Sequence, residues 1–173
     1  AEKQLDIRQE ILGTDHVETA RTMQTLASLL YSVGEYDTSD QLYRQAISVR
    51  RELLGEDHPA YAQSVSGLGM LLLQTGEYEE AEVRIREALE VYRALYGEEC
   101  HDVSVGLNNL GMLYRSLGDY PAAERMYQRA LDITRKVFGE EHPEVAASLN
   151  NLGHMYYTKG DYVAAEEHYR EAL

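Results

Sequence analysis

The chain has 173 residues, about the length of one domain, and its apolar content of 44% is ordinary for a folded protein. A formal net charge of −14 argues against nucleic acid and against an anionic membrane surface as main partners. No apolar run could cross a membrane, nothing at the start resembles a signal peptide, and the single cysteine excludes an intramolecular disulfide, which together favour a cytoplasmic location.

Two sets of glycines recur at a step of 42 residues and divide the chain into similar segments. Self-similarity at such a period indicates a stacked-repeat architecture, in which each repeat buries its apolar face against its neighbours. In the second set, each glycine is followed by an acidic residue and then a tyrosine. The members are Gly13, Gly55, Gly97 and Gly139 in the first set and Gly34, Gly76, Gly118 and Gly160 in the second.

Helical periodicity between these glycines predicts a pair of helices in each repeat, and no segment reads as a strand. A leading helix within 1–12 precedes three full pairs, 17–54, 59–96 and 101–138, and a truncated pair, 143–173. We interpret residues 1–12 as the second helix of a preceding repeat and the whole chain, 1–173, as a single segment of a longer solenoid. The first helices are expected at 17–33, 59–75, 101–117 and 143–159, and the second helices at 36–54, 78–96, 120–138 and from 162 onward.

The last repeat illustrates the local signals. Apolar residues from Val145 to Tyr156 form a single helical stripe. Pro143 fits the first turn of that helix, Gly160 suits its end, and Asp161 is a candidate N-cap for the next helix. Small residues recur where paired helices approach closely, at Ala27, Gly69, Gly111 and Gly153.

The segments Leu152-Gly153-x-x-Tyr156 and Gly160-x-Tyr162-x-x-Ala165 resemble the tetratricopeptide repeat pattern. The 42-residue period and linkers such as Gly55-Glu-Asp-His-Pro59 are similar to the longer repeats of kinesin light chain and nephrocystin. The resemblance implies an all-α fold, a right-handed α-solenoid of stacked antiparallel helix pairs whose first helices line the inner, concave surface. It also implies a non-catalytic protein–protein interaction module.

A polar and aromatic stripe lies opposite the core stripe of each first helix, and the resemblance places it on the inner surface. Such side chains suit an extended peptide, which offers main-chain donors and acceptors, so we expect a peptide-binding face. The alternative is a solvated helix face. The candidate residues of this stripe are Arg21, Gln63, Met70, Leu73, Met112, Arg115, His154 and Tyr157.

Adjacent asparagines stand in the first helices of repeats three and four, as Asn108-Asn109 and Asn150-Asn151. Asparagine is a mediocre helix former, so two in a helix interior need a reason. The resemblance to kinesin light chain implies that these amides hold a bound peptide's main chain. The alternative, that they tie neighbouring repeats together, stays open.

Three histidines, His16, His58 and His142, share one repeat position, which Cys100 occupies in the third repeat. Residues one repeat apart are too distant to share an ion, so a loop or capping role is favoured and no metal site is expected. Acidic pairs such as Glu98-Glu99 lie in exposed linkers that do not tune carboxylates for acid–base chemistry. We therefore expect no catalytic residues and no cofactor.

The function that follows from these patterns is an adaptor or scaffold that binds an extended peptide or partner segment in its concave groove. Two alternatives remain. The chain could be a structural spacer that self-associates through its solenoid ends, or a regulatory sensor arm of a larger multidomain enzyme.

Overall fold

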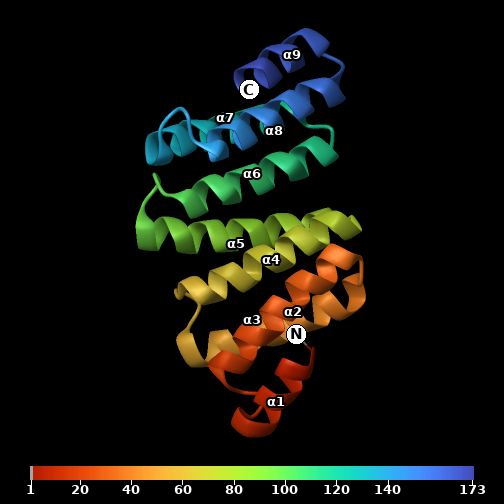
Figure 1. Cartoon of the computed structure of the whole chain (residues 1–173), viewed down its shortest axis with the longest axis vertical. Helices are drawn as coiled ribbons and strands as arrows, with labels where there is room; N and C mark the ends of the chain where they lie inside the picture. Colours follow the sequence, from red (N-terminus) through yellow and green to blue (C-terminus); the bar gives the residue numbers. More distant parts are fainter. Residues whose placement is uncertain (1) are drawn as a thin grey trace. The chain divides into compact units, whose positions relative to one another are not determined.

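The computed structural model describes residues 2–173, and within them every regular element is an α-helix (Figure 1). These helices are α1 Glu2–Leu12, α2 Val17–Val33, α3 Tyr36–Leu54, α4 Pro59–Thr75, α5 Tyr78–Tyr96, α6 His101–Ser116, α7 Tyr120–Phe138, α8 Pro143–Lys159 and α9 Tyr162–Glu171. Their bounds agree with the expected ranges, except that α6 ends one residue early. The all-α class is confirmed.

The chain divides into two compact units, Ala1–Val91 and Tyr92–Leu173. In the first unit, α2 packs against α1, α3 and α4. In the second unit, α8 packs against α6, α7 and α9. The single continuous solenoid expected over 1–173 stays a prediction, and each unit is described below by itself.

Histidine side chains begin three of the first helices. The Nδ1 atoms of His16, His58 and His142 each accept a hydrogen bond from a backbone N–H two residues on, at 3.2, 3.1 and 3.2 Å. The capping role expected for these histidines is confirmed. Cys100, at the same repeat position before α6, makes no such bond, so this helix starts without a side-chain cap.

Glycines in the left-handed conformation end the first helices. Gly34, Gly76 and Gly160 have φ values of 87°, 87° and 88°, which a side chain would strain. Asp161 then accepts a hydrogen bond from the backbone N–H of Ala164 and caps α9, as expected. The glycines therefore allow these tight turns, and the turn before α9 is also stabilised by Asp161.

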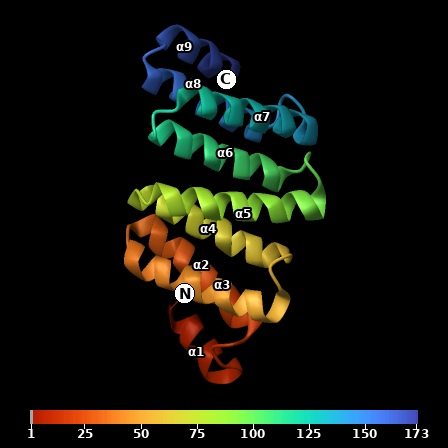
Figure 2. The ribbon, with the colours of Figure 1, turned by 180° about the vertical axis from the view of Figure 1, so that it is seen from behind.

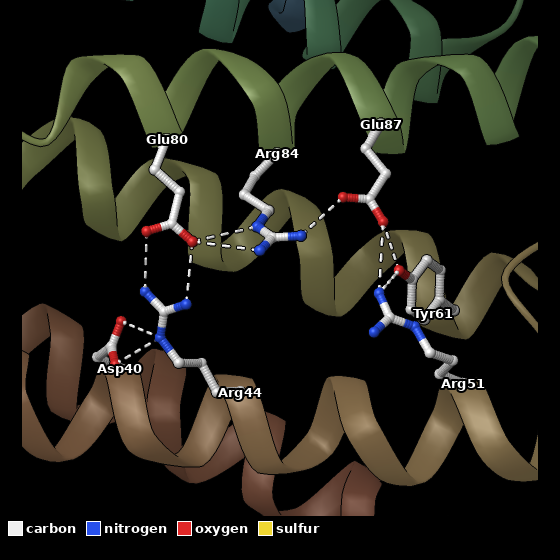
Figure 3. A network of polar contacts seen from close by, with 7 residues as sticks. All are labelled: Asp40, Arg44, Arg51, Tyr61, Glu80, Arg84 and Glu87. Carbon is white, nitrogen blue, oxygen red and sulfur yellow. Dashed lines mark hydrogen bonds and ion pairs between the residues drawn. The ribbon is translucent and has the colours of Figure 1, made fainter.

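An ionic network joins the second helices α3 and α5 of the first unit (Figure 3). Arg44 donates to both oxygens of Glu80, at 2.9 and 3.2 Å, and also pairs with Asp40 at 2.8 Å. Arg84 then bridges Glu80 and Glu87, at 3.2 and 3.0 Å. Because these groups are partly exposed, the network contributes modestly to stability.

The core of the second unit lies between α7 and α8 and includes Ala123, Tyr127, Leu131, Val145, Leu149, Leu152 and Met155. Glycines on the first helices let tyrosines of the second helices approach closely. A Cβ atom at Gly111 would come within 2.7 Å of the Tyr127 ring, and one at Gly153 within 2.7 Å of the Tyr169 ring. The close approach expected at these two small residues is therefore confirmed.

Candidate peptide-binding face

The first helices α6 and α8 of the second unit lie side by side, with α7 on their other side (Figures 1 and 2). On α6, the candidate residues Asn108, Met112 and Arg115 follow at i, i+4 and i+7, which places them on one side of the helix. Asn150, His154 and Tyr157 have the same spacing on α8. We call these six residues, together with Asn151, the α6–α8 face.

Two side-chain contacts join the helices across this face. The amide of Asn151 donates to the side-chain oxygen of Asn108 at 3.4 Å, a long hydrogen bond. Nearer the C-terminal ends of the helices, Arg115 Nη1 contacts His154 Nδ1. The structure thus brings together four of the residues singled out from the sequence, two from each helix.

The asparagines differ in their exposure. Asn150 is exposed, and its amide makes no hydrogen bond to another described residue, whereas Asn108 and Asn151 are half-buried. Asn109 is only 7% exposed, so its side chain offers little to a ligand on this face. One asparagine pair thus supplies a tie between helices, and Asn150 supplies an amide that is open to solvent.

The imidazole of His154 lies against the guanidinium of Arg115, which carries its positive charge at all relevant pH values. Burial, and then the positive charge of Arg115, lower the pKa of His154 below its ordinary value.

Apolar groups complete the face. The Met112 side chain is half-buried, and Tyr157 is 57% exposed with its ring edge against Tyr162 at a centroid distance of 5.5 Å. An exposed tyrosine and a flexible, half-buried methionine can each offer adaptable apolar surface.

The candidates of the first unit are less well assembled. Arg21 pairs with Glu18 of its own helix at 2.8 Å, Gln63 is exposed, Met70 is half-buried, and Leu73 is only 8% exposed. Among the described residues, no side-chain hydrogen bond joins any two of these four. In the described part of the chain, the contacts between candidate side chains thus lie in the second unit.

Sequence reasoning missed Arg50, which is 2% exposed and donates to Ala60 O at 2.6 Å and to Ser64 Oγ at 2.7 Å. It also contacts the side-chain amide oxygen of Gln24 on α2. Arg8, one repeat earlier, donates to Glu18 O at 2.9 Å in the same way. The sequence signal that could have revealed this contact is the arginine that recurs at the same repeat position, as Arg8 and Arg50.

The described helices include none that is both long and apolar enough to span a bilayer. In that same part of the chain, no group of three or more histidine, cysteine or acidic side chains is placed to hold a metal ion.

A family model described as tetratricopeptide repeat matches residues 1–52, 25–94 and 102–173. The chain belongs to the tetratricopeptide repeat family. Repeats of this family are generally non-catalytic, and their presence suggests a scaffold for protein–protein interaction. No curated protein sequence matches it.

Solved structures of other tetratricopeptide repeat proteins have the same fold. BtubC (BKLC) from P. vanneervenii is 27% identical, with a TM-score of 0.79 over 97% of this chain and 75% of that one. A putative kinesin light chain from Podosopora anserina is 20% identical, with a TM-score of 0.80 over 99% of this chain and 81% of that one. The resemblance to kinesin light chain repeats is thus confirmed, while the likeness to nephrocystin stays a prediction.

A Rap protein, solved in complex with Competence and Sporulation Factor, is 24% identical to this tetratricopeptide repeat chain. Its TM-score is 0.77 over 90% of this chain and 42% of that one. At this level of identity the likeness shows the shared fold alone.

Proposed function

We propose that the α6–α8 face binds an extended segment of a partner protein, and that the chain acts as a non-catalytic, cytoplasmic adaptor. The observation that carries the proposal is the amide arrangement of Asn108, Asn150 and Asn151. Each amide has two donors and an acceptor, so the single bond between Asn108 and Asn151 leaves most of this capacity unused. A peptide main chain, which alternates donors and acceptors, can use it whatever its sequence.

The strength of the existing bond supports this role. At 3.4 Å, the contact between Asn151 and Asn108 is longer than a typical N–H···O hydrogen bond. Replacing this bond with a hydrogen bond to a ligand therefore costs little free energy. Exposed Asn150, one residue before Asn151, extends the same amide surface along α8.

Neighbouring groups add contacts that depend on the partner's sequence. Met112 and Tyr157 offer apolar surface, and Arg115 and His154 offer charge and a hydrogen-bond donor. Such a combination fits main-chain binding with a preference at a few side chains. The Rap protein, solved in complex with Competence and Sporulation Factor, shows that a chain of this fold can hold a binding partner.

The test is a screen of random peptides of about a dozen residues, followed by mapping of the hits through backbone amide shifts. We expect the shifts to concentrate on α6 and α8. Asn150→Ala should weaken binding without changing helicity or melting temperature, because Asn150 is exposed.

Gln128→Ala, which removes an exposed amide from the second helix α7, is the matched control and should leave peptide binding unchanged. Peptides that bind but shift residues away from α6 and α8 would contradict the proposal. A screen without hits would contradict it as well and would favour the spacer alternative.

A further inference from the structure

A hollow opens in the first unit where the start of α3, the end of α4 and the residue before α5 meet. Its volume is about 380 Å³. Since a water molecule takes up about 30 Å³ in the liquid, the hollow has room for a ligand of several heavy atoms. Leu71 of α4, which is 1% exposed, contributes apolar lining, and Tyr36 at the start of α3 adds an aromatic ring.

The charged groups that line this hollow do not balance. Three of them are carboxylates, those of Asp37, Asp40 and Glu77, and one is the guanidinium of Arg44. Arg44 is already paired with Asp40 and with Glu80 (Figure 3). The carboxylate of Asp37 has no hydrogen-bond or ion-pair partner among the described residues, and Glu77 accepts one side-chain hydrogen bond, from a hydroxyl at 3.0 Å. Negative charge in the hollow is therefore left without a positive partner.

The equivalent positions two repeats later have a different charge. One carboxylate of the hollow is replaced there by proline, and an amide and a hydroxyl are replaced by cations. The replacements are Asp37 by Pro121, Gln41 by Arg125 and Thr75 by Lys159. The hydroxyl of Tyr120, which corresponds to Tyr36, also donates to the carbonyl oxygen of Thr158 at 3.5 Å, a bond that Tyr36 does not make. The negative hollow is therefore a feature of the first unit's own sequence and is not common to the repeats.

We propose that this hollow binds an alkyl guanidinium group, carried either by an arginine side chain of a partner protein or by a free small molecule. A guanidinium is planar, has five N–H donors and stacks on aromatic rings. In the complex it donates to the carboxylates of Asp37 and Glu77 and to the amide oxygen of Gln41. Its face lies on the ring of Tyr36, and its alkyl stem packs on Leu71. The site lies in the first unit and does not depend on the proposed function of the α6–α8 face.

The probes are an acetylated pentapeptide amide, Ala-Ala-Arg-Ala-Ala, and its counterpart with a central citrulline, which has nearly the same shape without the charge. Each is titrated into the full chain and followed through backbone amide shifts. We expect the arginine peptide to shift amides at the start of α3 and the end of α4, and the citrulline peptide to bind at least several-fold more weakly.

Butylguanidinium distinguishes the two sources of the group, because it carries the guanidinium on an alkyl chain without a peptide. Tighter binding than that of the arginine peptide supports a small-molecule ligand. Weaker binding at the same amides supports an arginine of a partner protein.

Two variants alter the hollow at exposed positions, so both should keep the helicity of the wild type. Asp37→Asn removes a carboxylate with little change in shape and should weaken binding of the arginine peptide several-fold. Gln41→Arg introduces the residue found two repeats later and should abolish binding, because its charge competes with the ligand. Glu52→Gln, at another exposed position of α3, is the matched control and should leave binding unchanged.

The control is needed because a chain with a net charge of −14 attracts any cation. Equal losses of binding in Asp37→Asn and Glu52→Gln would identify such general attraction and overturn the site. Equal affinity for the arginine and citrulline peptides, or no shifts on α3 and α4 at millimolar peptide, would overturn it as well. The peptide screen on the α6–α8 face reports on other residues, so the proposed function and this site stand or fail separately.

Discussion

Asn151 on α8 and Asn108 on α6 share a hydrogen bond of 3.4 Å between their side-chain amides. The residues lie 43 positions apart, so the bond joins first helices of successive repeats, not neighbours along one helix. The pair ties two helices together, which is one of the two roles considered for the asparagines. In the proposed function, a ligand replaces this long hydrogen bond.

A double-mutant cycle measures the coupling energy between these two side chains. We expect Asn108→Ala and Asn151→Ala to show a coupling energy below about 1 kcal/mol, because a long, partly exposed hydrogen bond contributes little net stability. Urea unfolding of the wild type, both single variants and the double variant gives this value. A coupling above about 2 kcal/mol would identify the asparagines as structural and weaken the proposed binding role.

A missing helix cap provides a second prediction. Cys100 makes no side-chain hydrogen bond at the start of α6, whereas His142 accepts one from Glu144 N at 3.2 Å. Cys100→Ser places a good N-cap of nearly the same size there and should stabilise the chain by about 0.5–1 kcal/mol. In a thermal melt this corresponds to a rise of about 1–4 °C.

Cys100→Ala, which supplies no acceptor, serves as the control and should not raise the melting temperature. His142→Ala should lower stability by about 1 kcal/mol. Equal melting temperatures for the serine and alanine variants would contradict the assignment of an uncapped helix.

The fold was predictable because its signals are local and recur. A glycine with φ near 87° ends a helix wherever it stands, as at Gly34 and Gly76, and a proline at the first turn marks the start of α4 at Pro59. Each signal affects only residues that are close to it in the sequence. Because these signals occur in four repeats at a fixed step, the helix bounds could be predicted to within one residue.

The candidate site was only partly predictable, because its contacts depend on how helices from different repeats are rotated and spaced. Periodicity placed Arg115 and His154 on one side of their helices, but it could not show that the two side chains touch. Nor could it show that Asn109 is buried while Asn150 is exposed. Arg50 escaped notice since its partners belong to α2 and α4 rather than to its own helix, α3.

A buried hydroxyl provides a third prediction. Tyr127 is fully buried, its hydroxyl makes no hydrogen bond to the described residues, and burial raises its pKa to about 12. Tyr127→Phe removes an unsatisfied polar group and should leave stability unchanged or raise it by up to about 1 kcal/mol. Chemical unfolding of the variant and the wild type measures the difference.

Tyr43 occupies the equivalent position in the first repeat, and there a hydrogen bond with Ser28 partly offsets the burial that raises its pKa. The residue equivalent to Ser28 in the third repeat is Met112, which explains the lone hydroxyl of Tyr127. Tyr43→Phe should therefore destabilise by about 1 kcal/mol. The same change at two repeat positions would then have different outcomes, and an equal loss at both would contradict this account.

The contribution of the first unit's ionic network to stability depends on pH (Figure 3). The hydrogen bond from Arg44 lowers the pKa of Glu80, so the contribution is present above the unfolded-state pKa of about 4.3. It is lost as pH falls through the lower value of the folded state. Glu80→Gln should thus cost at most about 1 kcal/mol at neutral pH, since Glu80 and Arg44 are 34% and 42% exposed.

Below about pH 4 the difference between Glu80→Gln and the wild type should shrink, and about 1 M salt should reduce it at neutral pH. Glu79→Gln, at the exposed neighbouring position on α5, is the matched control and should have no effect at any pH. Urea unfolding between about pH 3 and about pH 7 tests both variants. If their stabilities do not differ at neutral pH, or differ equally throughout, the bridge from Arg44 to Glu80 does not stabilise the packing of α3 against α5.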